Sequence, residues 1–119
     1  MTGSRNWKLQ WICAALGLVG YAAQAAGDSQ DVLISRGKAA FTHRCAMCHR
    51  EGQTGTFILA RRLGKEKSLL EQRPDLQPAY VRQVVRAGLV NMPRLSRVEM
   101  PDTDLDAVIA YLVSPKGSP

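Results

Sequence analysis

The chain has 119 residues and a formal net charge of +6, from 16 basic and 10 acidic residues. Its length suits one domain, and its basic residues are spread among acidic ones, whereas nucleic-acid-binding proteins gather them into a stripe. We therefore expect a single small domain without a nucleic acid partner.

The first 25 residues have the pattern of an export signal. The pattern consists of two basic residues, an apolar run and an A-x-A cleavage site, at Arg5, Lys8, 11–23 and 23–25. The apolar run is too short and too rich in glycine and alanine for a stable membrane anchor. We predict a signal peptide over residues 1–25, a mature domain over residues 26–119 and a periplasmic location.

The first helix of the mature chain is predicted to start near Asp31 and to run into Cys45. Its apolar stripe has helical spacing and consists of Leu33, Gly37, Ala40 and Phe41. Glycine in mid-helix costs about 1 kcal/mol relative to alanine. Gly37 therefore predicts that another helix approaches closely at that point.

The segment Cys45-Ala46-Met47-Cys48-His49 follows this helix. Two cysteines separated by two residues, with histidine directly after the second, are typical of covalent attachment of a c-type haem. On one helical turn the two sulfurs reach the two vinyl groups of the porphyrin, and the imidazole reaches the iron. We predict that Cys45 and Cys48 attach one haem c covalently and that His49 is an axial ligand of its iron.

Two other interpretations of these residues are weaker. A thioredoxin-like redox pair needs a βαβ context, whereas the flanking sequence has a helical pattern. A zinc-binding module needs four ligands, and the other histidine, His43, lies two positions before Cys45, too near to complete a tetrahedron. We expect His43 to be a solvated side chain.

Residues 50–73 show the weakest pattern of the chain. We predict one short helix around residues 65–71. Four apolar residues are expected to wall the haem, namely Phe57, Ile58, Leu59 and Leu63. Arg61 and Arg62 are expected on the solvated surface, with a haem propionate as the alternative partner.

The next helix is predicted to start at Pro78, because a missing N–H costs nothing in the first turn, and to stop at Gly88. Its buried stripe consists of Val81, Val84 and Val85. Met92 and Pro93 follow in the loop after this helix.

A thioether is the usual partner of histidine on a haem iron that transfers electrons. We predict Met92 as the sixth ligand, with Met100, which also precedes a proline, as the alternative. Met47 lies between the two cysteines, on the side of His49, and is not a candidate.

The last helix is predicted from Thr103 to Val113, with Asp102 as its cap. Its apolar residues recur at i, i+3, i+4 and i+7, as Leu105, Val108, Ile109 and Leu112. This stripe is expected to pack on the first helix at Gly37 and Phe41. No strand pattern is present, so the predicted fold class is all-α.

Together these motifs resemble the class I monohaem cytochrome c family. The shared elements are Gly37 and Phe41 before the haem motif, the helix end 85–88, Met92 with Pro93, and the closing residues 110–112. The resemblance implies a class I cytochrome c fold, in which short helices wrap around one covalent haem. Two frequent family features are absent: a proline whose neighbouring carbonyl accepts a hydrogen bond from the axial histidine, and a tryptophan at a propionate.

A narrower resemblance is to the small cytochrome subunits of flavoprotein dehydrogenases of the vanillyl-alcohol oxidase type, such as those that oxidise 4-alkylphenols or eugenol. It rests on residues 55–64 and 94–99. It implies a flavoprotein dehydrogenase as the electron donor and a periplasmic redox protein or oxidase as the acceptor, with no catalytic residue in this chain. The alternatives are a stand-alone electron carrier to a terminal oxidase, and a haem enzyme or sensor whose sixth site is open.

Overall fold

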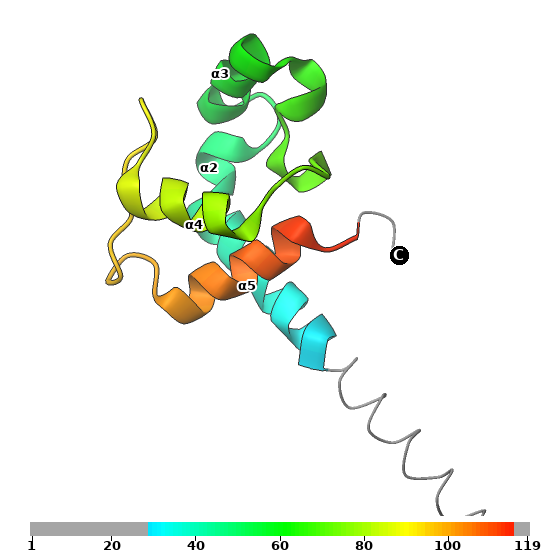
Figure 1. Cartoon of the computed structure of the whole chain (residues 1–119), viewed down its shortest axis with the longest axis vertical. Coiled ribbons are helices and arrows are strands. Elements are labelled where there is room, and N and C mark those ends of the chain that lie inside the picture. The colour runs from blue at the N-terminus through cyan, green and yellow to red at the C-terminus, as the bar shows by residue number, and fades with distance from the viewer. Residues whose placement is uncertain (1–28, 116–119) are drawn as a thin grey trace, which may run out of the picture. The chain divides into compact units, whose positions relative to one another are not determined.

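A computed structural model describes residues 29–115, so the predicted signal peptide lies outside the described residues. The compact unit begins at Leu33. A helix over residues 29–44 is followed by the elements seen in Figure 1: α2 (Ala46–His49), α3 (Thr54–Leu63), η1 (Lys65–Lys67), η2 (Leu70–Gln72), α4 (Pro78–Ala87) and α5 (Asp102–Val113). The predicted all-α class is confirmed, because the β pairing found over residues 29–115 is an isolated bridge between Leu89 and Met92.

None of the described helices combines the length and the apolar character that crossing a membrane requires.

The N-terminal helix crosses α5 at Gly37 (Figure 1, cyan and orange). A Cβ atom at position 37 would lie 2.0 Å from the carbonyl oxygen of Ala107 and 2.8 Å from the Cβ atom of Tyr111. Only glycine permits so close an approach of two backbones. One turn further along, the rings of Phe41 and Tyr111 pack with their centroids 5.9 Å apart. The predicted contact between the first and last helices is confirmed.

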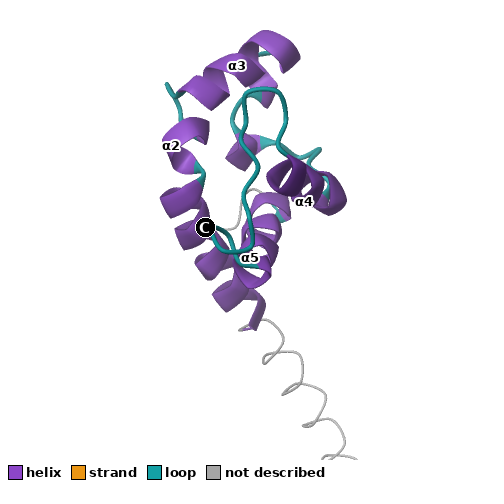
Figure 2. Cartoon of the chain, turned by 90° about the vertical axis from the view of Figure 1, so that its left-hand side faces the viewer, coloured by secondary structure: helices purple, strands orange, loops and turns teal. Residues whose placement is uncertain are grey.

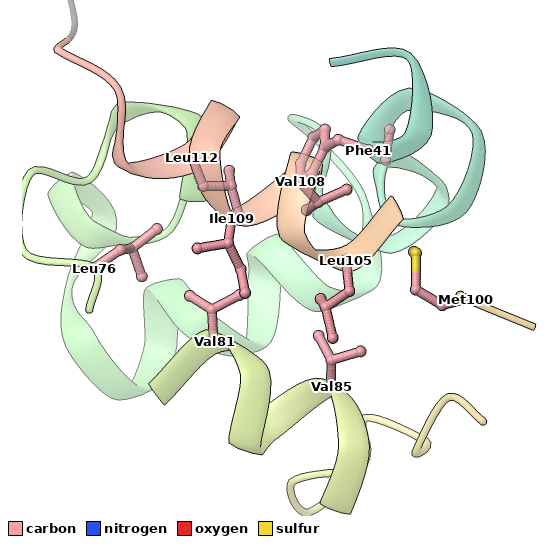
Figure 3. Packing of buried hydrophobic residues seen from close by; sticks show 10 residues of the cluster. Phe41, Leu76, Val81, Val85, Met100, Leu105, Val108, Ile109 and Leu112 are labelled. Carbon is pink, nitrogen blue, oxygen red and sulfur yellow. The ribbon is translucent and has the colours of Figure 1, made fainter. Parts of the chain in front are cut away.

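α5 also buries the apolar face of α4. Figure 3 shows Val81 and Val85 of α4 pointing towards Ile109 and Leu105 of α5. The four predicted core residues of α5 are each at most 6% exposed. Val84, the third residue of the predicted stripe on α4, is half-buried and lines a cavity instead. α5 is therefore the element on which both the N-terminal helix and α4 pack.

α3 was not expected from the sequence. Its first turn contains Thr54, Gly55 and Thr56, which are poor helix formers. The hydroxyl of Thr56 is buried and donates a hydrogen bond of 2.9 Å to the carbonyl oxygen of Arg50, directly after α2. This contact with the preceding turn therefore stabilises the start of α3, where intrinsic propensity is weak.

The prediction of a single helix around residues 65–71 is wrong. The structure has two 3-10 turns there, η1 and η2, separated by Leu69 in an extended conformation with φ −89° and ψ 110°. The hydroxyl of Ser68 donates to the carbonyl oxygen of Lys65 at 2.7 Å. The backbone N–H of Ser68 donates to the same carbonyl at 3.2 Å, so both bonds belong to the end of η1.

α4 has the predicted ends, since Pro78 is its first residue and Gly88 follows it with φ +77°. α5 begins at Asp102, so Asp102 is not the cap that the sequence suggested. The Asp102 carboxylate instead accepts hydrogen bonds from Arg86 at 2.6 Å and from Arg97 at 2.8 Å. In Figure 2 the connection between α4 and α5 is drawn as a long teal loop that ends at the start of α5.

Gly37→Ala is expected to lower the free energy of unfolding by about 2–4 kcal/mol, because the Ala107 backbone can yield only if the two helices separate. Unfolding in denaturant measures the loss. Lys38→Ala is the control, since Lys38 is exposed on the same helix, and we expect it to change the free energy by less than about 0.5 kcal/mol. Equal losses in the two variants would contradict a close crossing at Gly37.

Candidate functional site

Cys45, Cys48 and His49 lie on one helical turn. The amide N–H groups of Cys48 and His49 both donate to the carbonyl oxygen of Cys45, at 3.1 Å and 2.9 Å. Residues three and four positions apart share one face of a helix. All three side chains line the same cavity, whereas Met47, between the cysteines, is 75% exposed. The local backbone therefore aligns two thiols and an imidazole without help from distant parts of the chain.

α3 packs its backbone directly against this turn. A Cβ atom at Gly55 would lie 2.6 Å from the carbonyl oxygen of Cys48 and 3.2 Å from Cε1 of His49. Gly55 is thus a positioning residue, which the sequence pattern did not reveal. A glycine seven residues after Cys48 was the available signal, but spacing alone did not show which atoms it would meet.

A cavity of about 300 Å³ lies beside the turn. Its walls come from the N-terminal helix, α3, the segment before α4, α4 itself, the loop after α4, and α5. Met92 lines this cavity from the loop, together with Cys45, Cys48 and His49 from the motif. The structure therefore brings all four predicted site residues to one cavity, although Met92 is distant from the others in sequence.

The apolar wall on α3 is close to the expectation. Ile58, Leu59 and Leu63 line the cavity. Phe57 does not, and it is 60% exposed. Its ring lies under the guanidinium of Arg61, 5.8 Å from Cζ. Phe57 was wrongly expected in the wall, because it shares the outer face of α3 with Arg61, four residues later.

Two arginines add positive charge to the wall. Arg62 is exposed, as expected, and also lines the cavity, while Arg73 lines it with only 11% of its side chain exposed. Arg73 donates to both oxygens of the Asp75 carboxylate, at 2.9 Å and 3.1 Å. These bonds lower the pKa of Asp75 to about 2. No aspartate or glutamate is among the lining residues, so the cavity suits a mainly apolar ligand with negatively charged groups.

The loop that carries Met92 makes a tight turn. The N–H of Leu89 donates to the carbonyl of Met92 at 3.0 Å, and the N–H of Met92 donates back to the carbonyl of Leu89 at 2.9 Å. Gly88 begins the turn, and a Cβ atom there would lie 2.8 Å from the Met92 carbonyl oxygen. Val90 has a φ of +54°, which β-branched residues rarely adopt.

The remaining candidates lie elsewhere. Met100, the alternative axial ligand, is 1% exposed in the hydrophobic core and does not line the cavity. His43 is exposed, as expected. Cys45 and Cys48 are not joined in a disulfide, and no group of three or more His, Cys, Asp or Glu residues between positions 29 and 115 could hold a metal ion. The zinc-binding alternative therefore gains no support.

Burial sets the protonation of the donor groups. It lowers the pKa of the His49 imidazole, which keeps the ring neutral with a lone pair available for a metal. Burial, and to a smaller extent the charge of Cys48, raises the pKa of the Cys45 thiol to about 11. Nδ1 of His49 is buried and has no hydrogen-bond partner among the described residues. In the class I cytochromes c that this sequence resembles, a carbonyl next to a proline often accepts the hydrogen bond from this nitrogen. No other group between residues 29 and 115 takes the place of that carbonyl.

The residues of the cavity fit the haem that the motif predicts. Two thiols lie on one helical turn beside a neutral imidazole, Met92 lines the same cavity, and the wall is apolar with two arginines, of which Arg73 is paired with Asp75. Neutral histidine and the methionine thioether are established axial ligands of haem iron.

Arg73 and Tyr80, which also line the cavity, were not identified from the sequence, because no periodic pattern marks the segment around them.

A comparison with protein families matches residues 32–112 to the model described as cytochrome C oxidase, cbb3-type, subunit III. Neither a curated protein nor a solved structure matches the chain in the corresponding searches. The matched segment includes the cysteine–histidine turn, the Met92 loop and nearly all of α5.

Val90→Asn is expected to raise the free energy of unfolding by about 0.5–1 kcal/mol, because asparagine tolerates the left-handed conformation better than valine. Unfolding in denaturant measures the change. Val98→Asn is a matched control, because Val98 is 92% exposed and its φ is not positive. A gain of the same size in both variants would show that loss of exposed apolar surface, and not relief of backbone strain, is the cause.

Proposed function

Because the chain belongs to the cytochrome c family described as cytochrome C oxidase, cbb3-type, subunit III, we propose that it carries single electrons through one haem c held by Cys45, Cys48, His49 and Met92. Membership of a cytochrome c family implies electron transfer and covalent haem. The assignment of these four residues to the haem rests on their common place at one cavity.

Each of the four residues has a distinct part in this proposal. The thiols of Cys45 and Cys48 attach the cofactor at one edge, and His49 offers a neutral nitrogen on the same turn. The bound haem supplies an iron that changes oxidation state by one electron. Met92 would be the second axial ligand of the iron, which would leave no coordination site for a substrate. Apolar walls from α3 and α4 exclude water, which with the thioether favours a high reduction potential.

The alternative of a haem enzyme or sensor with an open sixth site is less well supported. It requires a cavity without a second axial donor. Met92 lines the cavity together with His49, whereas Met100 is enclosed in the core among residues such as Leu105 and Phe41.

The ligand assignment is tested by the same substitution at two positions. Met92→Leu is expected to keep the covalent haem, abolish the methionine-to-iron charge-transfer band of the oxidised protein, lower the potential and allow carbon monoxide to bind after reduction. Met100→Leu conserves core volume and is expected to cost less than about 1.5 kcal/mol of stability while keeping the band. The reverse pattern would transfer the axial role to Met100, and a band unaffected by either substitution would contradict ligation by Met92 and by Met100.

We also propose that electrons reach the haem from a flavoprotein dehydrogenase in the periplasm. The rim of the cavity supports a protein partner, because Tyr80, Leu89 and Val90 line it and are 51%, 43% and 76% exposed. Exposed apolar residues that cluster in this way mark interaction sites. The positive charge of Arg62 at the same wall suits an acidic partner surface.

A second candidate is a carrier that delivers electrons to a terminal oxidase. The description of the matching family model, which names an oxidase subunit, favours this candidate. The two proposals differ in the partner and agree on the haem site.

Purification of the exported protein from its native source separates the two candidates. The flavoprotein proposal expects a flavin-containing subunit to copurify, and its substrate to reduce the haem rapidly in the purified complex. A preparation that contains oxidase subunits and no flavin would favour the second candidate. Either outcome leaves the haem site itself to be judged by the Met92 and Met100 variants.

A further inference from the structure

We propose that Arg86 is a positioning residue, whose guanidinium holds the segment after Met92 against α4 and thereby keeps the Met92 thioether at the cavity. This inference rests on the proposed function in one respect, namely that Met92 is the sixth ligand. It assigns to the chain a second determinant of axial ligation, outside the cavity wall.

Arg86 lies in the last turn of α4, and its side chain is 18% exposed. Nη1 donates to the carbonyl oxygens of Leu95 at 3.1 Å and Ser96 at 3.2 Å. Nη2 donates to the carbonyl oxygen of Met100 at 2.8 Å and to the Asp102 carboxylate at 2.6 Å. One side chain therefore holds three backbone carbonyls of the α4–α5 connection and the first residue of α5.

These contacts close a loop around Met92. On one side, α4 ends at Gly88, and the Leu89–Met92 turn follows directly. On the other side, the N–H of Leu95 donates to the Val85 carbonyl at 2.8 Å, while the Leu95 carbonyl accepts from Arg86. Both polar backbone groups of Leu95 are thus bound to α4. The segment that carries Met92 is therefore attached to the end of α4 on both sides, at Gly88 and at Leu95.

The chemistry of the side chain explains why arginine suits this position. Its planar guanidinium presents several N–H groups at fixed angles, and hydrogen bonds from a charged donor are stronger than those between neutral groups. Lysine has a single flexible ammonium and cannot span three carbonyls and a carboxylate in the same way. Nε of Arg86 is buried without a hydrogen-bond partner, so its hydrogen bonds are made by the two terminal nitrogens.

Asp102 orients the guanidinium from the side of α5. Its second oxygen accepts from Arg97 at 2.8 Å. Hydrogen bonds from Arg97 and Arg86 lower the pKa of the Asp102 carboxyl, so the carboxylate stays charged at lower pH than an ordinary aspartate. The three hydrogen bonds from Arg86 to backbone carbonyls do not involve Asp102. Loss of the carboxylate should therefore weaken the attachment of the Met92 segment to α4 without abolishing it.

Arg82 provides a matched control on the same helix. It lies one turn before Arg86, and it also pairs with an aspartate of α5, Asp106. Within the described residues it makes no hydrogen bond to the connection that carries Met92. Arg82→Gln therefore removes an arginine–aspartate pair between α4 and α5 but leaves the Met92 loop untouched.

The experiment compares haem-loaded Arg86→Gln, Arg86→Lys, Asp102→Asn and Arg82→Gln. Imidazole is titrated into the oxidised proteins, and loss of the methionine charge-transfer band reports displacement of Met92. Unfolding in denaturant is measured in parallel. We expect imidazole affinity to rise about tenfold in Arg86→Gln, less in Arg86→Lys, least in Asp102→Asn, and not at all in Arg82→Gln.

A merely structural role would lower unfolding stability in the Arg86 variants but leave imidazole affinity equal to that of Arg82→Gln, and this result would overturn the inference. If Arg86→Gln does not fold, Arg86→Lys and Asp102→Asn decide the question by the same comparison. A charge-transfer band that survives Met92→Leu would overturn the proposed ligation instead, so the two failures are distinguishable.

Discussion

The close crossing of the N-terminal helix and α5 is the contact on which the cavity depends. The two backbones touch at Gly37, so the distance between the helices cannot vary. Phe41, one turn later, packs on Tyr111 of α5, and its carbonyl accepts the N–H of Cys45 at 2.8 Å. The turn that carries the thiols is therefore held at a fixed position relative to α5. Because α4 packs on the same helix, the crossing also sets where the Met92 loop begins.

The two sides of the site are built by different kinds of interaction. The cysteines and His49 are aligned by two backbone hydrogen bonds within one turn, which any helical conformation of that segment would produce. Met92 is placed by the conformation of the loop and by its contacts with α4. The loop has a glycine with positive φ and a two-residue turn, and the segment after the methionine is hydrogen-bonded to the end of α4. Mutations distant from the cavity should therefore affect the methionine side more readily than the histidine side.

Features with a local or periodic signature could be predicted from the sequence. The four-residue stripe of α5, the ends of α4 and the crossing at Gly37 follow from spacing and from glycine and proline chemistry, and the structure agrees with each. The start of α3 could not be predicted, because a buried hydrogen bond from Thr56 stabilises a first turn of poor helix formers. The roles of Gly55 and Arg73 at the cavity depend on distances between segments, which no local pattern encodes. The four donor residues were predicted from the sequence, and the structure shows which hydrogen bonds fix the loop that carries Met92.

The cavity wall and the hydrophobic core share residues, among them Phe41, Val81, Val85 and Val108. These side chains therefore belong both to the hydrophobic core and to the surface that a bound ligand would contact. Once the chain has packed, the raised pKa of Cys45 leaves its thiol protonated and poorly nucleophilic. If Cys45 attaches the haem as we propose, its burial favours attachment before the last steps of folding enclose the thiol.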